Sequence, residues 1–292
     1  MAVLTLVDGE LADNVPVSDR GLLYGDGVFE TMHYRQHQLM RLPAHMLRLQ
    51  RSCEQLGIPL LMTDIQQHID SLLSRVSSLA DTPTDGIVKI IVTRGDGGRG
   101  YMPAATSQSR VVVQFHLMPT PYAECYRRGI SCMLCRHPVS INPALAGLKH
   151  LNRLDQVMAS RELAAAQNNA ANTDPMLQEG LMLDSLGDLT EGTRSNVFLV
   201  INDQLCTPDL TQAGVCGLMR NLILDWFEGQ GIPVTVRAIT GQELMLASEV
   251  FICNSVIGIW PVNSVYDFSS GTCIHLSSQT MARSAQQGLL SH

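Results

Sequence analysis

The sequence predicts an α/β protein of two domains, and three observations support this. The chain has 292 residues, of which 45% are hydrophobic and 16% charged, enough for a large core or for two packed ones. Stretches with helical spacing of apolar residues alternate with short stretches rich in β-branched residues. Pro119 and Pro121 favour a stiff, extended connector. We therefore expect a small N-terminal α/β domain (1–118), a linker (119–122) and a larger C-terminal α/β domain (123–292) with a mixed sheet or barrel.

The first domain should begin with a short strand and then contain two helices and two paired strands. The first helix has Pro43 near its first turn, Gly57 just past its end and its apolar residues on one stripe. The loop 94–109 between the paired strands is long, and long ordered loops tend to carry function. The expected elements are a strand at 2–7, helices at 42–56 and 64–79, and strands at 87–93 and 111–117.

The second domain should mix strands and helices, with mostly antiparallel or mixed strand pairing. A polar stretch at 167–174 is expected to be a disordered or variable insertion. The expected strands lie at 130–136, 180–184, 195–201, 234–238 and 249–254. One expected helix starts near Lys149 and runs to about residue 166. Three further helices are expected at 218–228, near 242–246 and at 277–288.

Composition excludes several classes of function. The net charge is −7 and no run of Lys or Arg occurs, which argues against nucleic acid and anionic membranes as partners. Residues 1–13 lack the cationic start of a secretory signal, and no stretch of eighteen apolar residues appears. The eight scattered cysteines suit reduced thiols in a cytoplasm. The nine histidines lack the spacing of metal ligands, so we expect no metal, and neither GxSxG nor HExxH occurs.

Two short motifs need interpretation. Cys132 and Cys135 form a CxxC without a second pair, which favours two half-buried strand residues over a zinc or redox site. Residues 95–100 match GxGxxG, but a dinucleotide site needs a helix directly afterwards, and none is predicted here. We instead expect a flexible loop that presents Arg99 and Tyr101 to an anion, with a solvated loop as the alternative.

Lys149 is the strongest candidate for chemistry. It follows a loop broken by Pro143, it stands at the start of an expected amphipathic helix, and the only other lysine is Lys89. Partial burial against apolar neighbours favours a neutral amine, which can attack a carbonyl and hold a cofactor as a Schiff base. The alternative is a surface lysine at a helix start.

Three other positions could support such a cofactor. Arg48, on the polar side of its helix, suits bidentate phosphate binding. Glu191 precedes a strand and could keep a pyridine nitrogen protonated. The amides that begin at Gly217 open a helix and could receive phosphate. Each residue alone also has an ordinary structural explanation. Arg48 could lie on a solvated helix face, Glu191 could be an acid in a turn, and Gly217 could be part of an ordinary helix cap.

Together, these pieces resemble the fold-type IV pyridoxal-phosphate enzymes over nearly the whole chain. That family includes branched-chain aminotransferases, D-amino acid aminotransferases and 4-amino-4-deoxychorismate lyases. The segments that carry the resemblance are, in chain order, residues 18–31 (SDRGLLYGDGVFET), 45–49 (HMLRL), 93–95 (TRG), Lys149, Glu191 with Ser195-Asn196, Gly217-Leu218, Asn254-Ser255 and Pro261-Val262.

Within the family, the chain looks most like the aminodeoxychorismate lyases. This likeness rests on KHLNRL at 149–154 and RGDGGRGY at 94–101. The Gly-Asn-Tyr that usually follows the lysine of branched-chain aminotransferases is absent. The implied activity is that of a carbon–oxygen lyase of folate biosynthesis, which converts 4-amino-4-deoxychorismate to 4-aminobenzoate and pyruvate. The alternatives are an aminotransferase of D-amino or branched-chain amino acids, and a non-catalytic binding protein that has kept the fold.

The resemblance also implies roles toward pyridoxal 5'-phosphate. Lys149 is expected to hold the cofactor as a Schiff base and to move protons, and Glu191 to face the pyridine nitrogen. More residues separate Lys149 from Glu191 in this sequence than is usual in the family, and the polar stretch at 167–174 accounts for the extra residues. The groups expected around the phosphate are Arg48, the amides of Gly217 and Leu218, Ser255 and Asn254.

The substrate site is expected to draw on four residues. Arg99 and Tyr101 are implied to meet a substrate carboxylate at the interface of a homodimer. Phe29 and Thr31 come from the motif at 18–31 and are expected to contact the substrate as well.

Overall fold

The computed structural model describes residues 3–120, 122–169 and 176–290. It contains two compact units. The first unit comprises Met1–Pro119 and Leu148–Asn152, and the second comprises Thr120–Gly147 and Arg153–His292. The short segment Leu148–Asn152 therefore packs with the first unit, whereas the predicted division assigned all of 123–292 to one domain.

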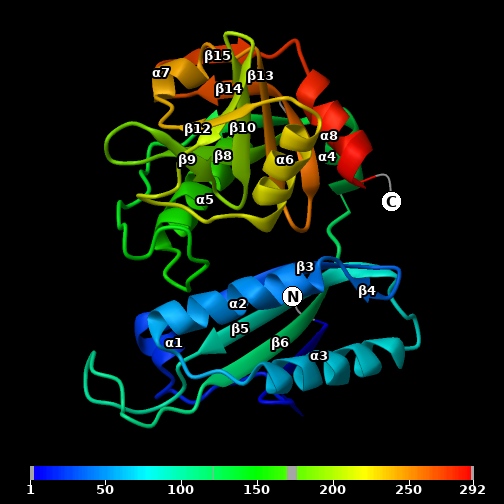
Figure 1. Ribbon diagram of the computed structural model, residues 1–292, viewed down its shortest axis with the longest axis vertical. Coiled ribbons are helices and arrows are strands. Elements are labelled where there is room, and N and C mark those ends of the chain that lie inside the picture. Colours follow the sequence, from blue (N-terminus) through cyan, green and yellow to red (C-terminus); the bar gives the residue numbers. More distant parts are fainter. Residues whose placement is uncertain (1–2, 121, 170–175, 291–292) are drawn as a thin grey trace. The chain divides into compact units, whose positions relative to one another are not determined.

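The first unit is a six-stranded antiparallel sheet with the order β2-β1-β6-β5-β3-β4. Figure 1 shows α2 and α3 beside the strands of this sheet. The predicted helix at 42–56 matches α2, and the helix predicted at 64–79 is α3, two residues earlier. The strands are β1 (Leu4–Val7), β2 (Glu10–Leu11), β3 (Gly27–Arg35), β4 (Gln38–Leu39), β5 (Asp85–Thr93) and β6 (Arg110–Leu117), and the helices are α1 (Arg20–Tyr24), α2 (Leu42–Leu56) and α3 (Met62–Ser77).

Alternation along the strands gives this sheet two different faces. On the first face, Met32, Val88 and Phe115 are fully buried in one cluster with Leu49 of α2 and Ile69 of α3. Side chains of a strand alternate between faces, so the residues between them point the other way. This second face carries half-buried side chains, namely Phe29, Thr31, Lys89, Ile91 and Gln114.

The segment around Lys149 extends the edge of this sheet. The amide of Phe29 donates to the carbonyl of Lys149 at 2.9 Å, and the amide of Leu151 donates to the carbonyl of Gly27 at 3.0 Å. The helix that was expected to start near Lys149 begins only at Leu154. Lys149 therefore lies on a strand-like edge and not at the mouth of a helix.

The second unit is built on a nine-stranded mixed sheet that curls into a half-barrel. Its order is β12-β11-β10-β13-β14-β7-β8-β9, and β15 also pairs with β14. The strands are β7 (Ile130–Leu134), β8 (Leu177–Leu183), β9 (Leu189–Gly192), β10 (Asn196–Ile201), β11 (Gln204–Pro208), β12 (Val234–Arg237), β13 (Glu249–Asn254), β14 (Gly258–Asp267) and β15 (Thr272–His275). The helices are α4 (Tyr122–Arg128), α5 (Leu154–Gln167), α6 (Leu218–Gly229), α7 (Gly241–Leu244) and α8 (Thr280–Leu290).

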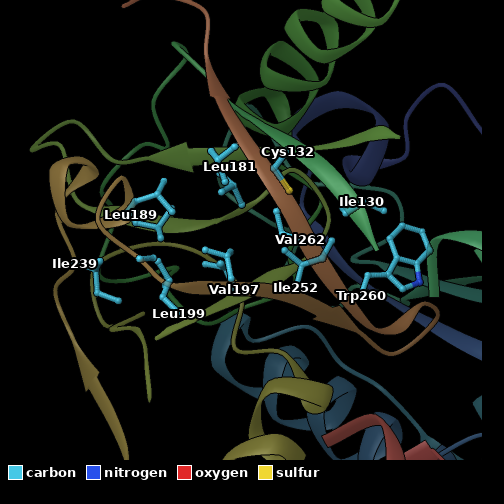
Figure 2. Packing of buried hydrophobic residues seen from close by; sticks show 14 of the residues in the cluster. Ile130, Cys132, Leu181, Leu189, Val197, Leu199, Ile239, Ile252, Trp260 and Val262 are labelled. Atoms are coloured by element: carbon cyan, nitrogen blue, oxygen red, sulfur yellow. The ribbon is translucent and has the colours of Figure 1, made fainter. Parts of the chain in front are cut away.

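Both faces of this sheet are buried at its centre. Figure 2 shows Val197, Ile252 and Val262 from three neighbouring strands packed in one cluster. On the opposite face, Phe198 and Phe251 stack with ring centroids 5.0 Å apart and pack against α6 and α8. Burial on both faces explains why the central strands are almost continuously hydrophobic.

The expected elements of the second unit largely occur near their predicted positions. The strand at 249–254 is confirmed, and the helices at 218–228 and 277–288 are found at Leu218–Gly229 and Thr280–Leu290. Residues 170–174 of the predicted insertion lie outside the described residues. Among the helices that are described, none combines the length and the apolar character required to cross a membrane.

The buried face of α3 should dominate the stability of the first unit. Ile69 is fully buried, so Ile69→Ala should lower the free energy of unfolding by about 2–5 kcal/mol through lost burial and a residual cavity. Urea denaturation of the variant measures this. Gln67→Ala, an exposed position on the same helix, is the control and should change stability by less than about 0.5 kcal/mol.

Candidate active site

Lys149 lies over an aromatic ring on the second face of the first unit's sheet. Its Nζ is 4.1 Å from the ring centroid of Phe29, and the residue is half-buried. A lysine amine close to an apolar ring and partly shielded from water has the surroundings that favour reactivity. The alternative of a solvated lysine at a helix start does not fit this position.

Arg48 is oriented by a buried carboxylate. Its Nε and Nη2 donate to the two oxygens of Glu30 at 2.7 and 2.6 Å, and His45 Nδ1 lies 2.6 Å from Glu30 Oε2. Burial alone would raise the pKa of Glu30, but the hydrogen bonds and charges of Arg48 and His45 hold it below 4.5. The alternative of a solvated helix face is therefore wrong for Arg48, because its guanidinium is paired with a buried carboxylate. Glu30 lies on the helix-covered face of the sheet, whereas Lys149 contacts Phe29 of the second face.

The loop with Arg99 and Tyr101 is held in place by Arg20. The guanidinium of Arg20 donates to the carbonyls of Gly97, Gly100 and Tyr101 at 3.4, 3.0 and 2.8 Å. Arg20 itself is 4% exposed. The expected flexible loop is therefore anchored through its backbone.

The two predicted substrate residues of this loop point outward. The Tyr101 side chain is 86% exposed, and Arg99 is also exposed. Within the described part of the chain, the Arg99 guanidinium has no ion-pair partner. The loop thus presents a cation and a phenol on a fixed backbone.

A shared carboxylate supports the anchor. Asp26 accepts hydrogen bonds from Arg20 Nε at 2.9 Å and from Arg94 Nε at 2.8 Å. Burial would raise the pKa of Asp26, but the hydrogen bonds from Arg94 and Arg20 lower it. Arg94 also donates to the carbonyls of Leu56 and Gly57 at the end of α2.

Glu191 is buried on a strand of the second unit. It lies on β9 and is 4% exposed. Its Oε1 accepts a hydrogen bond from Gln156 Nε2 at 3.0 Å, and its Oε2 accepts one from the amide of Val215 at 2.8 Å. A buried carboxylate with two donors has a fixed orientation, so the turn-acid alternative is wrong. Sequence reasoning did not identify Gln156.

A second buried acid shapes the turn after β9. Glu179 is fully buried and accepts hydrogen bonds from the amides of Gly180 and Thr193 and from Ser195 Oγ. These bonds fix the chain between Glu191 and β10. The sequence analysis did not single out Glu179.

The start of α6 lies against Asn196. Gly217 is the residue before the helix and has no side-chain cap. A Cβ added to Gly217 would come within 1.9 Å of Asn196 Oδ1, so only glycine fits. Asn196 Nδ2 also donates to the carbonyl of Val215 at 2.9 Å. The loop before α6 is therefore held by Asn196 and Glu191 together, while the amide of Leu218 lies in the first turn.

Asn254 has a structural use in the turn between β13 and β14. Its Oδ1 accepts from the amides of Val256 and Ile257 at 2.8 and 2.9 Å, and its Nδ2 donates to the carbonyl of Arg194 at 2.9 Å. Ser255, the next residue, is half-buried in the same turn. Of these two predicted phosphate contacts, Asn254 already uses its side chain in three hydrogen bonds within the protein, so Ser255 is the better candidate to bind a phosphate.

The cysteine pair is deeply buried. Cys132 and Cys135 pack in core clusters on or next to β7. Burial raises the pKa of the Cys132 thiol and raises that of Cys135 to about 12, which disfavours the reactive thiolates. No group of His, Cys, Asp and Glu within the described ranges could hold a metal ion.

Removing the charge of Glu30 should destabilise the protein in a pH-dependent way. The lowered pKa contributes stability that is fully present above about pH 4.5 and is lost as the pH falls through the lower folded value. Glu30→Gln should cost about 3–5 kcal/mol at neutral pH, because His45 and Arg48 lose their buried partner. The difference from the wild type should shrink below pH 4.5, as followed by urea denaturation across pH. Glu124→Gln, in an exposed pair with Arg128, should show a difference below about 1 kcal/mol and no such trend.

Gly217, just before α6, and Gly229, the last residue of α6, should respond oppositely to alanine. Gly217→Ala should lower the free energy of unfolding by about 1–3 kcal/mol because the methyl group overlaps Asn196. Gly229→Ala, where a Cβ meets nothing within 4 Å, should stabilise by about 0.4–1 kcal/mol. Thermal and urea denaturation of both variants provide the measurement. Equal effects at the two positions would contradict the close approach at Gly217.

Three comparisons place the chain among known proteins. Residues 27–265 match the family model described as Amino-transferase class IV. An aminodeoxychorismate lyase of Vibrio harveyi is 32% identical over 89% of this chain and 90% of that protein. A proposed branched-chain-amino-acid aminotransferase of Methanocaldococcus jannaschii is 34% identical over 85% and 81%.

A solved structure agrees along the full length. The crystal structure of 4-amino-4-deoxychorismate lyase from Pseudomonas aeruginosa is 37% identical, covers 98% of both chains and superposes with a TM-score of 0.85. The fold class expected from the sequence is thereby confirmed. With the family model matched across most of both units, the chain belongs to the class IV aminotransferase family of fold-type IV enzymes.

Proposed function

We propose that this protein is a pyridoxal-phosphate-dependent lyase that converts 4-amino-4-deoxychorismate to 4-aminobenzoate and pyruvate. The observation that carries the proposal is the 37% identity, over 98% of both chains, to a structure named as 4-amino-4-deoxychorismate lyase. The half-buried Lys149 beside Phe29 and the oriented, buried Glu191 support it.

The residues fit the cofactor on which the family depends. The Lys149 amine, partly shielded by an aromatic ring, is suited to covalent attachment of the cofactor through the cofactor's aldehyde group. A buried carboxylate with both oxygens oriented suits a protonated ring nitrogen. The uncapped start of α6, where a glycine leaves no Cβ, suits a phosphate group. Lys149, Glu191 and the amides after Gly217 would hold these three parts, with Arg48 and Ser255 as further phosphate contacts.

Bound pyridoxal phosphate supplies an electron sink, and the residues of the chain supply the proton transfers and the positioning. Lys149 takes the proton from C4 of the substrate. Loss of the enolpyruvyl group leaves an aromatic ring, and Lys149 returns a proton to the methylene carbon of the departing group, which becomes pyruvate. Glu191, whose two oxygens accept hydrogen bonds from Gln156 and the amide of Val215, would be the carboxylate partner of the ring nitrogen. Arg99 and Tyr101 receive a carboxylate of the substrate.

An aminotransferase is the competing function. The identity to the Methanocaldococcus jannaschii protein is similar to that of the Vibrio harveyi lyase, 34% against 32%. An aminotransferase returns the proton to the cofactor and needs a keto acid to complete its cycle. The two reactions therefore differ in what must be added for repeated turnover.

We further infer that the protein acts as a homodimer. Large apolar side chains around α1 and the loop after Gly100 are exposed, and the ring centroids of Tyr24 and Tyr101 lie 5.4 Å apart in an edge-on arrangement. Exposed apolar patches on soluble domains mark interaction sites. The exposed side chains are those of Leu22 (62%), Leu23 (53%), Tyr24 (36%), Tyr101 (86%) and Met102 (76%).

Product analysis tests the lyase proposal. Incubated with 4-amino-4-deoxychorismate and no keto acid, the enzyme should release pyruvate and 4-aminobenzoate in equal amounts over many turnovers. Lys149→Ala should lose this activity by several orders of magnitude, because one residue both anchors the cofactor and moves the protons. A requirement for a keto acid, with amino acids as donors, would establish the aminotransferase instead.

The dimer proposal has its own measurement. Met102→Glu places a charge in the apolar patch and should shift the protein toward a monomer in light scattering after size-exclusion chromatography. Leu61→Glu changes a side chain that is 67% exposed next to α3 and should leave the mass unchanged. A monomeric wild type would refute the proposal.

A further inference from the structure

All three side-chain nitrogens of Arg20 have acceptors, and most of these acceptors are carbonyls of the loop 94–109. Nη1 donates to the carbonyls of Gly97 and Gly100, and Nη2 donates to the carbonyl of Tyr101. Nε donates to the carboxylate of Asp26. Because the guanidinium is planar, it holds its donors in fixed directions and so fixes the three carbonyls relative to one another. Arg20 was not among the predicted site residues.

The three carbonyls lie on both sides of Arg99 in the chain. Gly97 is two residues before Arg99, and Gly100 and Tyr101 follow it directly. The amide of Arg99 also donates to the carbonyl of Met102 at 3.1 Å, which closes the tip of the loop. These contacts fix the backbone from which the exposed Arg99 side chain extends.

An aromatic contact extends the same hold to the Tyr101 side chain. The guanidinium carbon of Arg20 lies 5.0 Å from the ring centroid of Tyr24, and the Tyr24 ring meets that of Tyr101 edge-on. Both arrangements are favourable, the first through the ring's negative face and the second through its positive edge. Arg20 is therefore linked to Tyr101 through the backbone and, by way of Tyr24, through the ring.

The backbone of Arg20 has a rigid base. Arg20 begins α1, and the preceding residue, Asp19, accepts hydrogen bonds from the amides of Gly21 and Leu22 at 2.8 and 3.3 Å. Asp19 is fully buried and also accepts one from Thr93 Oγ1 at 2.8 Å. The arginine is thus held at its Cα by a capped turn and at its guanidinium by the loop.

We propose that Arg20 is a positioning residue of the substrate site. It sets the places of the Arg99 guanidinium and the Tyr101 hydroxyl without touching the substrate itself. This inference rests on the proposed function, in which Arg99 and Tyr101 receive a carboxylate of the substrate. Small displacements of groups that must meet a ligand together are costly, so losing the anchor weakens substrate binding.

A double-mutant cycle provides the first test. Arg20→Met should raise KM for 4-amino-4-deoxychorismate by about 10-fold, with kcat changed less than about threefold, because the displaced groups bind the substrate and do not move its protons. In an enzyme that already carries Arg99→Ala and Tyr101→Phe, the same change should alter KM by less than about twofold, because the positioned groups are gone. An equal rise of KM in both backgrounds would mean that Arg20 is merely structural, and would overturn the proposal.

Arg283→Met is the matched control. Arg283 of α8 also donates to two backbone carbonyls, those of Tyr126 and Arg127, but it belongs to the second unit. Its loss should lower stability and leave KM unchanged. A rise of KM as large as that of Arg20→Met would contradict a specific role for Arg20.

Limited proteolysis provides a test that needs no turnover. Trypsin cleaves after arginine, and cleavage after the exposed Arg99 requires the anchored loop to open. Arg20→Met should speed this cleavage by about 10-fold to 100-fold, as expected for lost hydrogen bonds to a charged group, and Arg283→Met should not. Arg20→Lys keeps the charge beside Asp26 without the planar fork and should also speed it, so the test stands even if Arg20→Met is unstable. Mass spectrometry of the fragments gives the rate at this bond.

The two tests separate this inference from the proposed function. If the protein makes no pyruvate from 4-amino-4-deoxychorismate but Arg20→Met speeds cleavage after Arg99, the lyase function is refuted and the hold of Arg20 on the loop stands. If the protein is an active lyase and Arg20→Met leaves KM unchanged, the positioning role is overturned, whatever the rate of cleavage, and the lyase function stands.

Discussion

The backbone pairing of residues 149–151 with β3 is the constraint that positions Lys149 in the first unit. Lys149 contributes its carbonyl and Leu151 its amide to this pairing, so the sheet edge fixes the backbone from the lysine to Leu151. The register then determines which way the side chain points, because a slip of one residue would move it to the other face. A flexible side chain thereby starts from a rigid Cα next to Phe29.

Four acids that are buried or half-buried share one feature, which is that each accepts hydrogen bonds from several donors. Glu30 has Arg48 and His45, and Asp26 has Arg20 and Arg94. In the second unit Glu179 serves the turn after β9, and Glu191 binds Gln156 and a backbone amide. Such carboxylates are hard to replace because removing one leaves several donors unsatisfied.

The sequence was sufficient for elements with clear end signals. Pro43 and Gly57 mark α2 at both ends, and the β-branched runs mark β5, β6 and β13. It was less sufficient where tertiary pairing overrides local pattern. The stretch after Lys149 has helical spacing, yet residues 149–151 pair with β3 and the helix starts later. The glycines after Gly95 suggested a flexible loop. The local sequence could not reveal that the loop is anchored, because the anchoring residue, Arg20, lies in a distant segment.

The candidate site was predictable to a similar degree. The family motif singled out Lys149 and Glu191 as candidates, but it did not predict the residues that contact and orient them in the structure. One signal was available in the sequence, since Glu30 occupies an apolar register position between Val28 and Met32 on β3, and an acid there indicates a buried pair. Gln156 gave no such signal, because a glutamine on a helix is ordinary and only the fold brings it to Glu191.

The anchored loop has a consequence for how specificity can change. Arg20 binds the backbone carbonyls of Gly97, Gly100 and Tyr101 and none of the loop's side chains. The loop's path is therefore largely independent of which side chains it displays, and little conformational entropy remains to be lost when a ligand arrives. Positions 99 and 101 can be exchanged for other residues on an unchanged frame. Under the proposed role of Arg99 and Tyr101 in substrate binding, single substitutions at these positions would change the substrate without changing the loop, and redesign could use the same route.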